Sequence, residues 1–301
     1  MNVRPVIGVL RTLRRFRQRE SWTRDQLRAY QAEALVALRE WSYDRSPFYR
    51  EFHQGLERAP LQELPVLTKP VLMEHFDAVV TDPAVRLSDL RARLPEEGNV
   101  GRFLNRYEMA ATSGSTGHPG IFLFDPEEWV SIIASFARAR EWAGLRLNLL
   151  RRSRMAVVSS TNERNLSARV GKAADTPFLP TLRLDATQPI QEITAKLNAW
   201  QPEALVAYAS MAYFLAGEQT AGNLNIHPEA VFTSSEVLTD QMRERIVEVW
   251  GNSVFDEYAS TETASIAAED GLHHGMHLLR GPADRRECGC AKHASRPWHL
   301  R

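Results

Sequence analysis

Short, mainly apolar runs alternate with longer amphipathic stretches from residue 121 onward. Continuous runs of this kind are typical of strands that are buried on both faces, as in a parallel sheet. Helical spacing of the apolar residues between the runs predicts intervening helices. The alternation indicates an α/β fold with mostly parallel strands flanked by helices. We expect strands at 121–124, 155–158, 205–208, 230–233 and 254–258, the last in the chain, and helices over 125–144, 190–200, 210–222 and 239–250.

An arginine-rich segment opens the chain. Between Arg4 and Arg24 it holds seven arginines and one acid, Glu20, with apolar residues among them. This composition fits an organelle transit peptide or a membrane-surface helix, although no secretory apolar core or cleavage site follows. A first helix that packs its apolar side on the domain explains the same pattern.

A second helix is expected from a cap at Ser21 to a stop before Pro47. Apolar residues recur along it at helical spacing and form a stripe. Residues 67–70 then indicate a turn into a short helix, and residues 82–105 indicate irregular structure. The stripe consists of Leu27, Tyr30, Ala34, Leu38 and Trp41.

Composition restricts the classes of function. The 301 residues are 44% hydrophobic and 25% charged, which is typical of one large folded domain, alone or with a small partner domain. Lys plus Arg and Asp plus Glu both number 37, so the net charge is zero and a nucleic-acid-binding surface is not expected. No stretch reaches the ~18 apolar residues of a membrane span. Cys288 and Cys290 are too few and too close for a disulfide framework, so we expect a cytoplasmic protein.

A loop rich in hydroxyls and glycine follows residue 111. Its glycines allow main-chain N–H groups to turn inward, and its hydroxyls add donors, so it can surround a phosphate chain. The Gly-Lys-Ser/Thr ending of a P-loop is missing. The Gly-x-Ser-x-Gly elbow of a serine hydrolase is also missing, which argues against Ser113 or Ser115 as a nucleophile.

A second candidate loop follows the predicted strand at 254–258. Tyr258 offers an aromatic face, Thr261 a hydroxyl, and Glu262 a carboxylate that can bind a magnesium ion. A helix cap would explain the Thr-Glu pair equally well. In a parallel sheet, loops at the carboxyl ends of strands form the ligand site, and both loops are placed accordingly.

The two loops together resemble those of the adenylate-forming superfamily, and most of all its phenylacetate–CoA ligase group. TSGSTGHPG at 112–120 is similar to that family's phosphate-binding loop, and Tyr-x-x-Thr-Glu at 258–262 is similar to its second motif. Residues 233–236 fall where the family has its adenine-contacting turn. Residues 64–69 and 271–273 also resemble the phenylacetate–CoA ligase group, and the resemblance covers roughly 21–280.

The resemblance implies the large amino-terminal domain of these enzymes and a two-step reaction. A carboxylic acid, aryl or arylacetic by resemblance, attacks ATP and releases pyrophosphate; CoA or a carrier-protein thiol then takes the acyl group. The implied cofactors are ATP, Mg²⁺ and CoA, and the implied assembly is a homodimer. By the same resemblance, Thr261 contacts the α-phosphate and Glu262 binds Mg²⁺. Ser235, Glu236 and Tyr258 frame the adenine, and Tyr208, Ser210 and Met211 line the acyl pocket. The residues that contact the β- and γ-phosphates are Thr112, Ser113, Gly114, Ser115, Thr116, Gly117 and His118.

Two departures from the family pattern bear on activity. His118 replaces the loop's lysine, so phosphate attraction should be weaker and depend on pH. We also expect the family's carboxy-terminal lid, with its catalytic lysine, to be missing.

The expected division of the chain is a basic segment at 1–20, an incomplete AMP-binding domain at 21–280 and a disordered, aberrant tail at 281–301. The alternative to a ligase is an impaired nucleotide-binding remnant.

A zinc site is a further alternative. His273, His274 and His277 precede a Cys-x-Cys pair and His293, and all are zinc-ligand types. Cys-x-Cys is tighter than the usual spacing, and half of the set lies in the tail. A polar turn explains the histidines as well.

Overall fold

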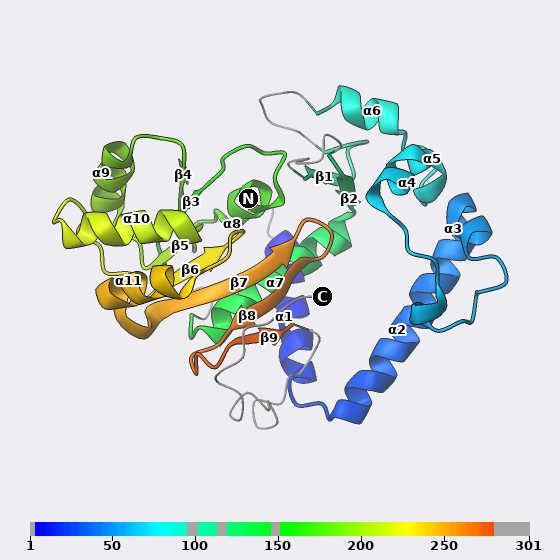
Figure 1. Cartoon of the computed structure of the whole chain (residues 1–301), viewed down its shortest axis with the longest axis horizontal. Coiled ribbons are helices and arrows are strands. Elements are labelled where there is room, and N and C mark those ends of the chain that lie inside the picture. Colours follow the sequence, from blue (N-terminus) through cyan, green and yellow to red (C-terminus); the bar gives the residue numbers. More distant parts are fainter. Residues whose placement is uncertain (1–3, 95–101, 113–118, 146–150, 280–301) are drawn as a thin grey trace.

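A seven-stranded sheet forms the centre of the part of the chain that the structure describes (Figure 1). The structure is a computed structural model, and it describes residues 4–94, 102–112, 119–145 and 151–279. The strand order is β4-β3-β5-β6-β7-β8-β9; the first five run parallel, and β8 and β9 are antiparallel to their neighbours. The strands are β3 (Met155–Ser159), β4 (Thr181–Asp185), β5 (Ala204–Tyr208), β6 (Ala230–Ser234), β7 (Val254–Ser260), β8 (Ala264–Glu269) and β9 (Met276–Leu278).

The α/β fold class is confirmed, and so are the predicted parallel strands at 155–158, 205–208, 230–233 and 254–258. The predicted strand at 121–124 forms, but it pairs antiparallel in a separate two-stranded sheet. The expectation that the strand at 254–258 is the last was wrong, because β7 turns back into β8 and β8 into β9. The missed β8 is composed largely of small residues, ASIAAE, and carries no strong β pattern. β4 was also missed, because it lies at the sheet edge and its TLRLD sequence alternates apolar with polar residues.

Helices cover both faces of the sheet, which is why the central strands are apolar throughout. Ala156 and Val158 of β3 lie in a core with α9, α10 and α11, whereas Met155 and Val157 point to the opposite face. On that face α8 packs beside β3 and β4, and α7 packs beside β8, with α1 packed on α7 (Figure 1). The helices are α7 (Pro126–Trp142), α8 (Leu166–Ala174), α9 (Ile190–Trp200), α10 (Ala209–Thr220) and α11 (Asp240–Trp250), with the 3₁₀ turn η2 (Gly251–Ser253).

A separate two-stranded hairpin, β1 (Glu108–Ala111) and β2 (Ile121–Phe124), leads into α7. Asp125 caps α7, and its carboxylate accepts hydrogen bonds from the N–H groups of Glu127 and Glu128 at 2.8 and 2.9 Å. Glu128 reaches back to the N–H of Asp125 at 2.8 Å and completes a capping box. The hairpin is therefore joined rigidly to the helix that covers the sheet.

The amino-terminal part combines one packed helix with an extended arm. Val9 and Leu13 of α1 (Arg4–Arg19) are buried against α7, as expected for a first helix packed on the domain. The helix α2 (Arg24–Arg45) begins at a Thr23 cap rather than at Ser21, because Thr23 forms a capping box with Gln26. The remaining elements are α3 (Pro47–Phe52), η1 (Leu61–Glu63), α4 (Lys69–Glu74), α5 (Phe76–Val79) and α6 (Leu87–Ala92).

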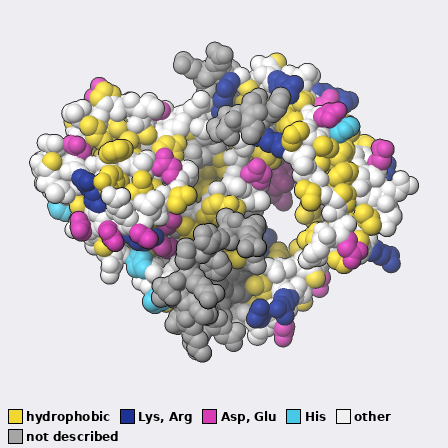
Figure 2. Space-filling model, viewed as in Figure 1, with side chains coloured by type: hydrophobic (Ala, Val, Ile, Leu, Met, Phe, Trp, Pro, Cys, Tyr) yellow, Lys and Arg dark blue, Asp and Glu magenta, His cyan; other side chains and the backbone are white. Residues whose placement is uncertain are grey.

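Four of the five stripe residues on α2 are exposed, and Leu27 is half-buried. Leu38 is 59% exposed and Trp41 is 47% exposed. Figure 2 shows hydrophobic side chains along this arm. The periodicity of α2 therefore predicted a helix correctly but did not identify a packing partner.

Candidate functional site

The carboxyl ends of the parallel strands gather polar loops at one edge of the sheet. β5 ends at Tyr208, β6 at Ser234 and β7 at Ser260, and the register pairs Tyr208 with Ser234. In α/β sheets this edge forms ligand sites, because loops from neighbouring strands meet there. The helix α10, which carries Ser210, and the loops that carry Glu236 and Glu262 all start from it.

The hairpin loop between β1 and β2 is fastened at its base by Thr112. The N–H of Thr112 donates to the carbonyl of Gly120 at 2.9 Å, and Thr112 Oγ1 accepts from the N–H of Gly120 at 2.9 Å. Lys69 Nζ, at the start of α4, also donates to Thr112 Oγ1, at 3.1 Å. A partly buried ammonium group thus lies at the base of the proposed phosphate loop. The loop residues Ser113, Gly114, Ser115, Thr116, Gly117 and His118 lie outside the described residues.

The two motif loops share a packed base. Ala110 of β1, Phe124 of β2 and Ala264 of β8 belong to one buried cluster. Ala110 lies two residues before Thr112, and Ala264 lies two residues after Glu262. The fold therefore brings together the two segments that the sequence analysis paired by resemblance.

The end of β7, which includes Tyr258, and the turn after it present their functional groups outward. Tyr258 is 56% exposed, and Glu262 is exposed, with no hydrogen bond or ion pair of its carboxylate within the described part of the chain. Ser260 and Thr263 close the turn, with their hydroxyls 2.9 Å apart. An open carboxylate on a tight turn suits a hard cation such as Mg²⁺, which binds through one or two carboxylates and substrate phosphates.

Ser235 and Glu236 lie beside the start of α10. Ser235 has a φ of 68°, a left-handed conformation that is uncommon for a residue other than glycine. This turn directs Glu236 back across the sheet edge, and its Oε2 accepts a hydrogen bond from the N–H of Ser210 at 2.9 Å. Glu236 therefore links the loop after β6 to the first turn of α10, where the adenine was expected.

Two further polar contacts hold the loop after β3. The N–H of Ser160 donates to the hydroxyl of Tyr208 at 2.9 Å. The carboxylate of Asp185 accepts from the N–H and hydroxyl of Thr161 at 3.0 and 2.6 Å, and from those of Thr187 at 2.9 and 2.6 Å. These hydrogen bonds, led by the Thr161 hydroxyl, hold the pKa of Asp185 well below its usual range.

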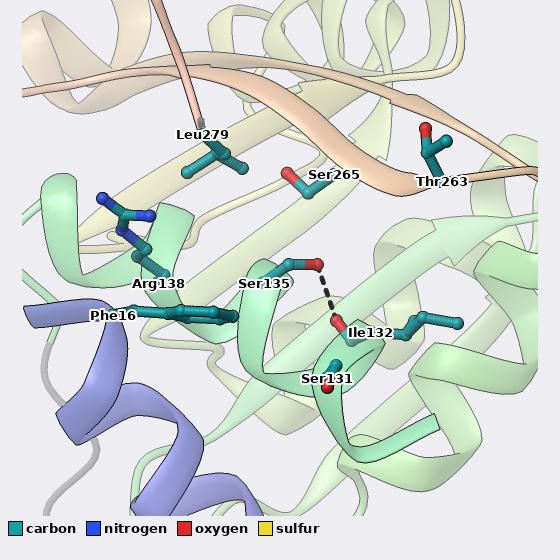
Figure 3. Close-up of a pocket in the computed structure, with 8 residues that line it drawn as sticks. All are labelled: Phe16, Ser131, Ile132, Ser135, Arg138, Thr263, Ser265 and Leu279. Carbon is teal, nitrogen blue, oxygen red and sulfur yellow. Dashed lines mark hydrogen bonds between the residues drawn. The ribbon is translucent and has the colours of Figure 1, made fainter. Parts of the chain in front are cut away.

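A cavity of about 250 Å³ opens between α7 and β8 (Figure 3). Thr263, the residue directly after Glu262, lies at one end, and Arg138 and Phe16 lie at the other. Tyr208, Ser210 and Met211 do not line it. The cavity is lined by Phe16, Ser131, Ile132, Ser135, Arg138, Thr263, Ser265 and Leu279.

Sequence reasoning missed the placement of Lys69 and this cavity. The Thr-Lys-Pro of residues 68–70 was interpreted only as a turn and as part of the family resemblance. The basic side chain of Lys69 was the signal in the sequence that could have indicated an anion-binding site. The cavity had no signal, because its serines are separated along the chain by ordinary helix residues.

No cluster of three or more metal-ligating side chains occurs in the described ranges. His273 and His277 lie within them, but Cys288, Cys290 and His293 of the zinc alternative lie outside. His273 stacks on Phe255 and its Nε2 lies 2.7 Å from the carbonyl oxygen of Asn252. No helix among the residues that the structure covers is long and apolar enough to cross a membrane.

Comparison with solved structures identifies the architecture. The chain is similar to 2-hydroxyisobutyryl-CoA ligase in complex with its acyl-adenylate and CoA, with a TM-score of 0.61 and 20% identity over 87% of this chain and 56% of the ligase. An open form of that ligase matches with a TM-score of 0.57 and 21% identity, over 82% of this chain and 53% of the ligase. The chain therefore shares the fold of the part of this ligase that it covers.

Sequence comparison adds one curated relative, Protein CapK of Staphylococcus aureus. It is 24% identical over 216 residues, which are 70% of this chain and 43% of CapK. No family profile matches the chain. The chain spans about half the length of the ligase and less than half of CapK.

Proposed function

We propose that this chain is the nucleotide-binding part of an ATP-dependent carboxylate–CoA ligase of the phenylacetate–CoA ligase type. The proposal is carried by the shared base of the two motif loops, through Ala110 and Ala264, at the ligand-binding edge of an adenylate-forming fold. In the proposed reaction, a carboxylate oxygen attacks the α-phosphorus of ATP and pyrophosphate leaves. The acyl-adenylate then passes its acyl group to the thiol of CoA.

The main requirement of the first step is neutralisation of negative charge, because the carboxylate and ATP are both anions and the leaving group, pyrophosphate, is a third. Lys69 and the loop that starts at Thr112 would hold the β- and γ-phosphates, and Thr261 would contact the α-phosphate. Glu262 would hold Mg²⁺, which neutralises phosphate charge when bound. Tyr258, Ser235 and Glu236 would frame the adenine.

The carboxylic acid would occupy the cavity that begins at Thr263. This position follows from the order of residues: Glu262, proposed at the phosphates, is adjacent to Thr263, which lines the cavity. A substrate there can direct its carboxylate toward the α-phosphorus while its remaining atoms lie between α7 and β8. A homodimer is part of the proposal by family resemblance.

Calorimetric titration with MgATP tests the nucleotide site. We expect binding by the folded chain and a roughly tenfold weaker affinity for Glu262→Gln, because one charge-assisted contact is lost. Glu244→Gln is the matched control, since Glu244 is an exposed residue of α11 remote from the motif loops. Absence of MgATP binding by a chain with a cooperative thermal transition would refute the nucleotide site. Acid-dependent pyrophosphate release then tests the catalytic step.

A further inference from the structure

The chemical lining of the cavity restricts the acid that can occupy it. At about 250 Å³ it lies below the ~300–1,000 Å³ of pockets for drug-sized ligands, so it suits a small molecule. Phe16, Ile132 and Leu279 form its apolar part, and hydroxyl groups from α7 and β8 form its polar part (Figure 3). The following step rests on the proposed function, because it takes this cavity as the acyl site.

Each serine hydroxyl of the cavity already donates a hydrogen bond within the protein. Ser131 and Ser135 donate to main-chain carbonyl oxygens of α7 at 3.0 and 2.8 Å. Ser265, which is buried, donates to the carboxylate of Glu257 at 2.7 Å. A hydroxyl has one proton and two lone pairs, so these groups can only accept from a ligand. At these three serines the cavity therefore favours a ligand group that donates hydrogen bonds.

Hydroxyl and ammonium groups both donate, and charge distinguishes them. Arg138 lines the cavity with a side chain that is 3% exposed and is paired with Glu20, Nε to Oε1, at 3.1 Å. Its fixed positive charge repels a ligand ammonium group at close range. A ligand hydroxyl is uncharged, so Arg138 does not repel it. An aryl group would satisfy the apolar wall but leave the serine lone pairs without donors.

We infer that the acid activated by this chain is a small, hydroxylated carboxylic acid, whose hydroxyl groups donate to Ser135 and Ser265. Discrimination would follow the usual rule for polar pockets. A site built to hydrogen-bond a substrate hydroxyl rejects the analogue that lacks it, because its own polar groups are then left unpaired. Tighter binding of an arylacetic acid, the substrate class implied by the family resemblance, is the opposite outcome of the test.

The test is a calorimetric titration of the full chain saturated with Mg²⁺ and α,β-methylene ATP, whose α–β bridge does not release pyrophosphate. Lactate, isobutyrate and alanine are compared, since they share one shape and differ in a hydroxyl, a methyl or an ammonium group. Glycerate and phenylacetate extend the series. We expect lactate and glycerate to bind about 3- to 10-fold more tightly than isobutyrate, alanine and phenylacetate, as one added hydrogen bond allows.

Ser135→Ala tests the assigned acceptor and should reduce the preference for lactate over isobutyrate by about 3-fold or more. Ser42→Ala is the control, because Ser42 is also a helix serine that donates to a carbonyl oxygen, Leu38 O, at 2.8 Å on the remote α2. The inference is overturned if phenylacetate, isobutyrate or alanine binds most tightly, if no acid binds while the nucleotide does, or if Ser135→Ala leaves the ratio unchanged. Failure of the nucleotide itself to bind would instead refute the proposed function.

Discussion

Lys69 Nζ donates a hydrogen bond to Thr112 Oγ1 at 3.1 Å, across 43 positions of the sequence. Thr112 begins the loop whose family counterpart supplies its own lysine, and this chain has His118 in that place. The ammonium group of Lys69 therefore provides a permanent positive charge at the base of a loop whose own sequence has no lysine or arginine. Its anchor on α4 connects the amino-terminal arm with the proposed phosphate site.

Lys69→Met should weaken MgATP binding by roughly tenfold, because an ammonium–phosphate contact is charge-assisted and the methionine keeps the apolar stem. Lys196→Met is the control, since Lys196 lies on α9 in an exposed pair with Glu192. Titration calorimetry on both variants measures the effect. Equal affinities for the two variants would show that Lys69 does not act on the nucleotide.

His118→Lys should tighten MgATP binding and make it less dependent on pH between pH 6 and 8. A lysine keeps its full charge across that range, whereas histidine titrates within it. The affinity of the original chain and the variant is measured at several pH values. Parallel pH profiles of the two proteins would contradict a phosphate-binding role for His118.

The central fold was predictable from the sequence because of where the strands lie. β3, β5 and β6 are buried on both faces, so their apolar runs are continuous and distinct from the helices around them. β8 was not predictable, because its small residues pack against α7 through contacts that only the tertiary structure supplies.

The site was predictable in its motifs but not in its assembly. Thr112, Tyr258 and Glu262 were found from local patterns, whereas the link from Lys69 depends on a contact between distant segments. The same holds for Ser135 and Ser265, which line one cavity only because α7 covers β8. A local sequence pattern predicts the structure of one segment. The cavity depends on packing between distant segments, which no local pattern contains.

Tyr208→Phe should loosen the loop after β3. The phenol oxygen accepts the hydrogen bond of the Ser160 N–H at 2.9 Å, and phenylalanine leaves that N–H without its acceptor. We expect a loss of about 1 kcal/mol in the free energy of unfolding. Faster hydrogen exchange at the Ser160 amide would locate the effect. Tyr30→Phe on α2 is the control, and an equal effect there would argue against a specific contact.

Asp185→Asn should lower the free energy of unfolding at pH 7 by about 1–2 kcal/mol, since the amide cannot accept all four hydrogen bonds of the carboxylate. The pKa of Asp185 is depressed in the folded chain, mainly by the Thr161 hydroxyl. A depressed pKa stabilises the folded state above the unfolded pKa of ~3.9. This stabilisation is lost as the pH falls through the folded pKa. The difference between the two proteins should therefore be constant from pH 5 to 7 and shrink below pH ~4. Urea denaturation at pH 3, 4, 5 and 7 measures it, with Asp44→Asn on α2 as the control. A difference that stayed constant down to pH 3 would show that the carboxylate charge is not what stabilises the loop.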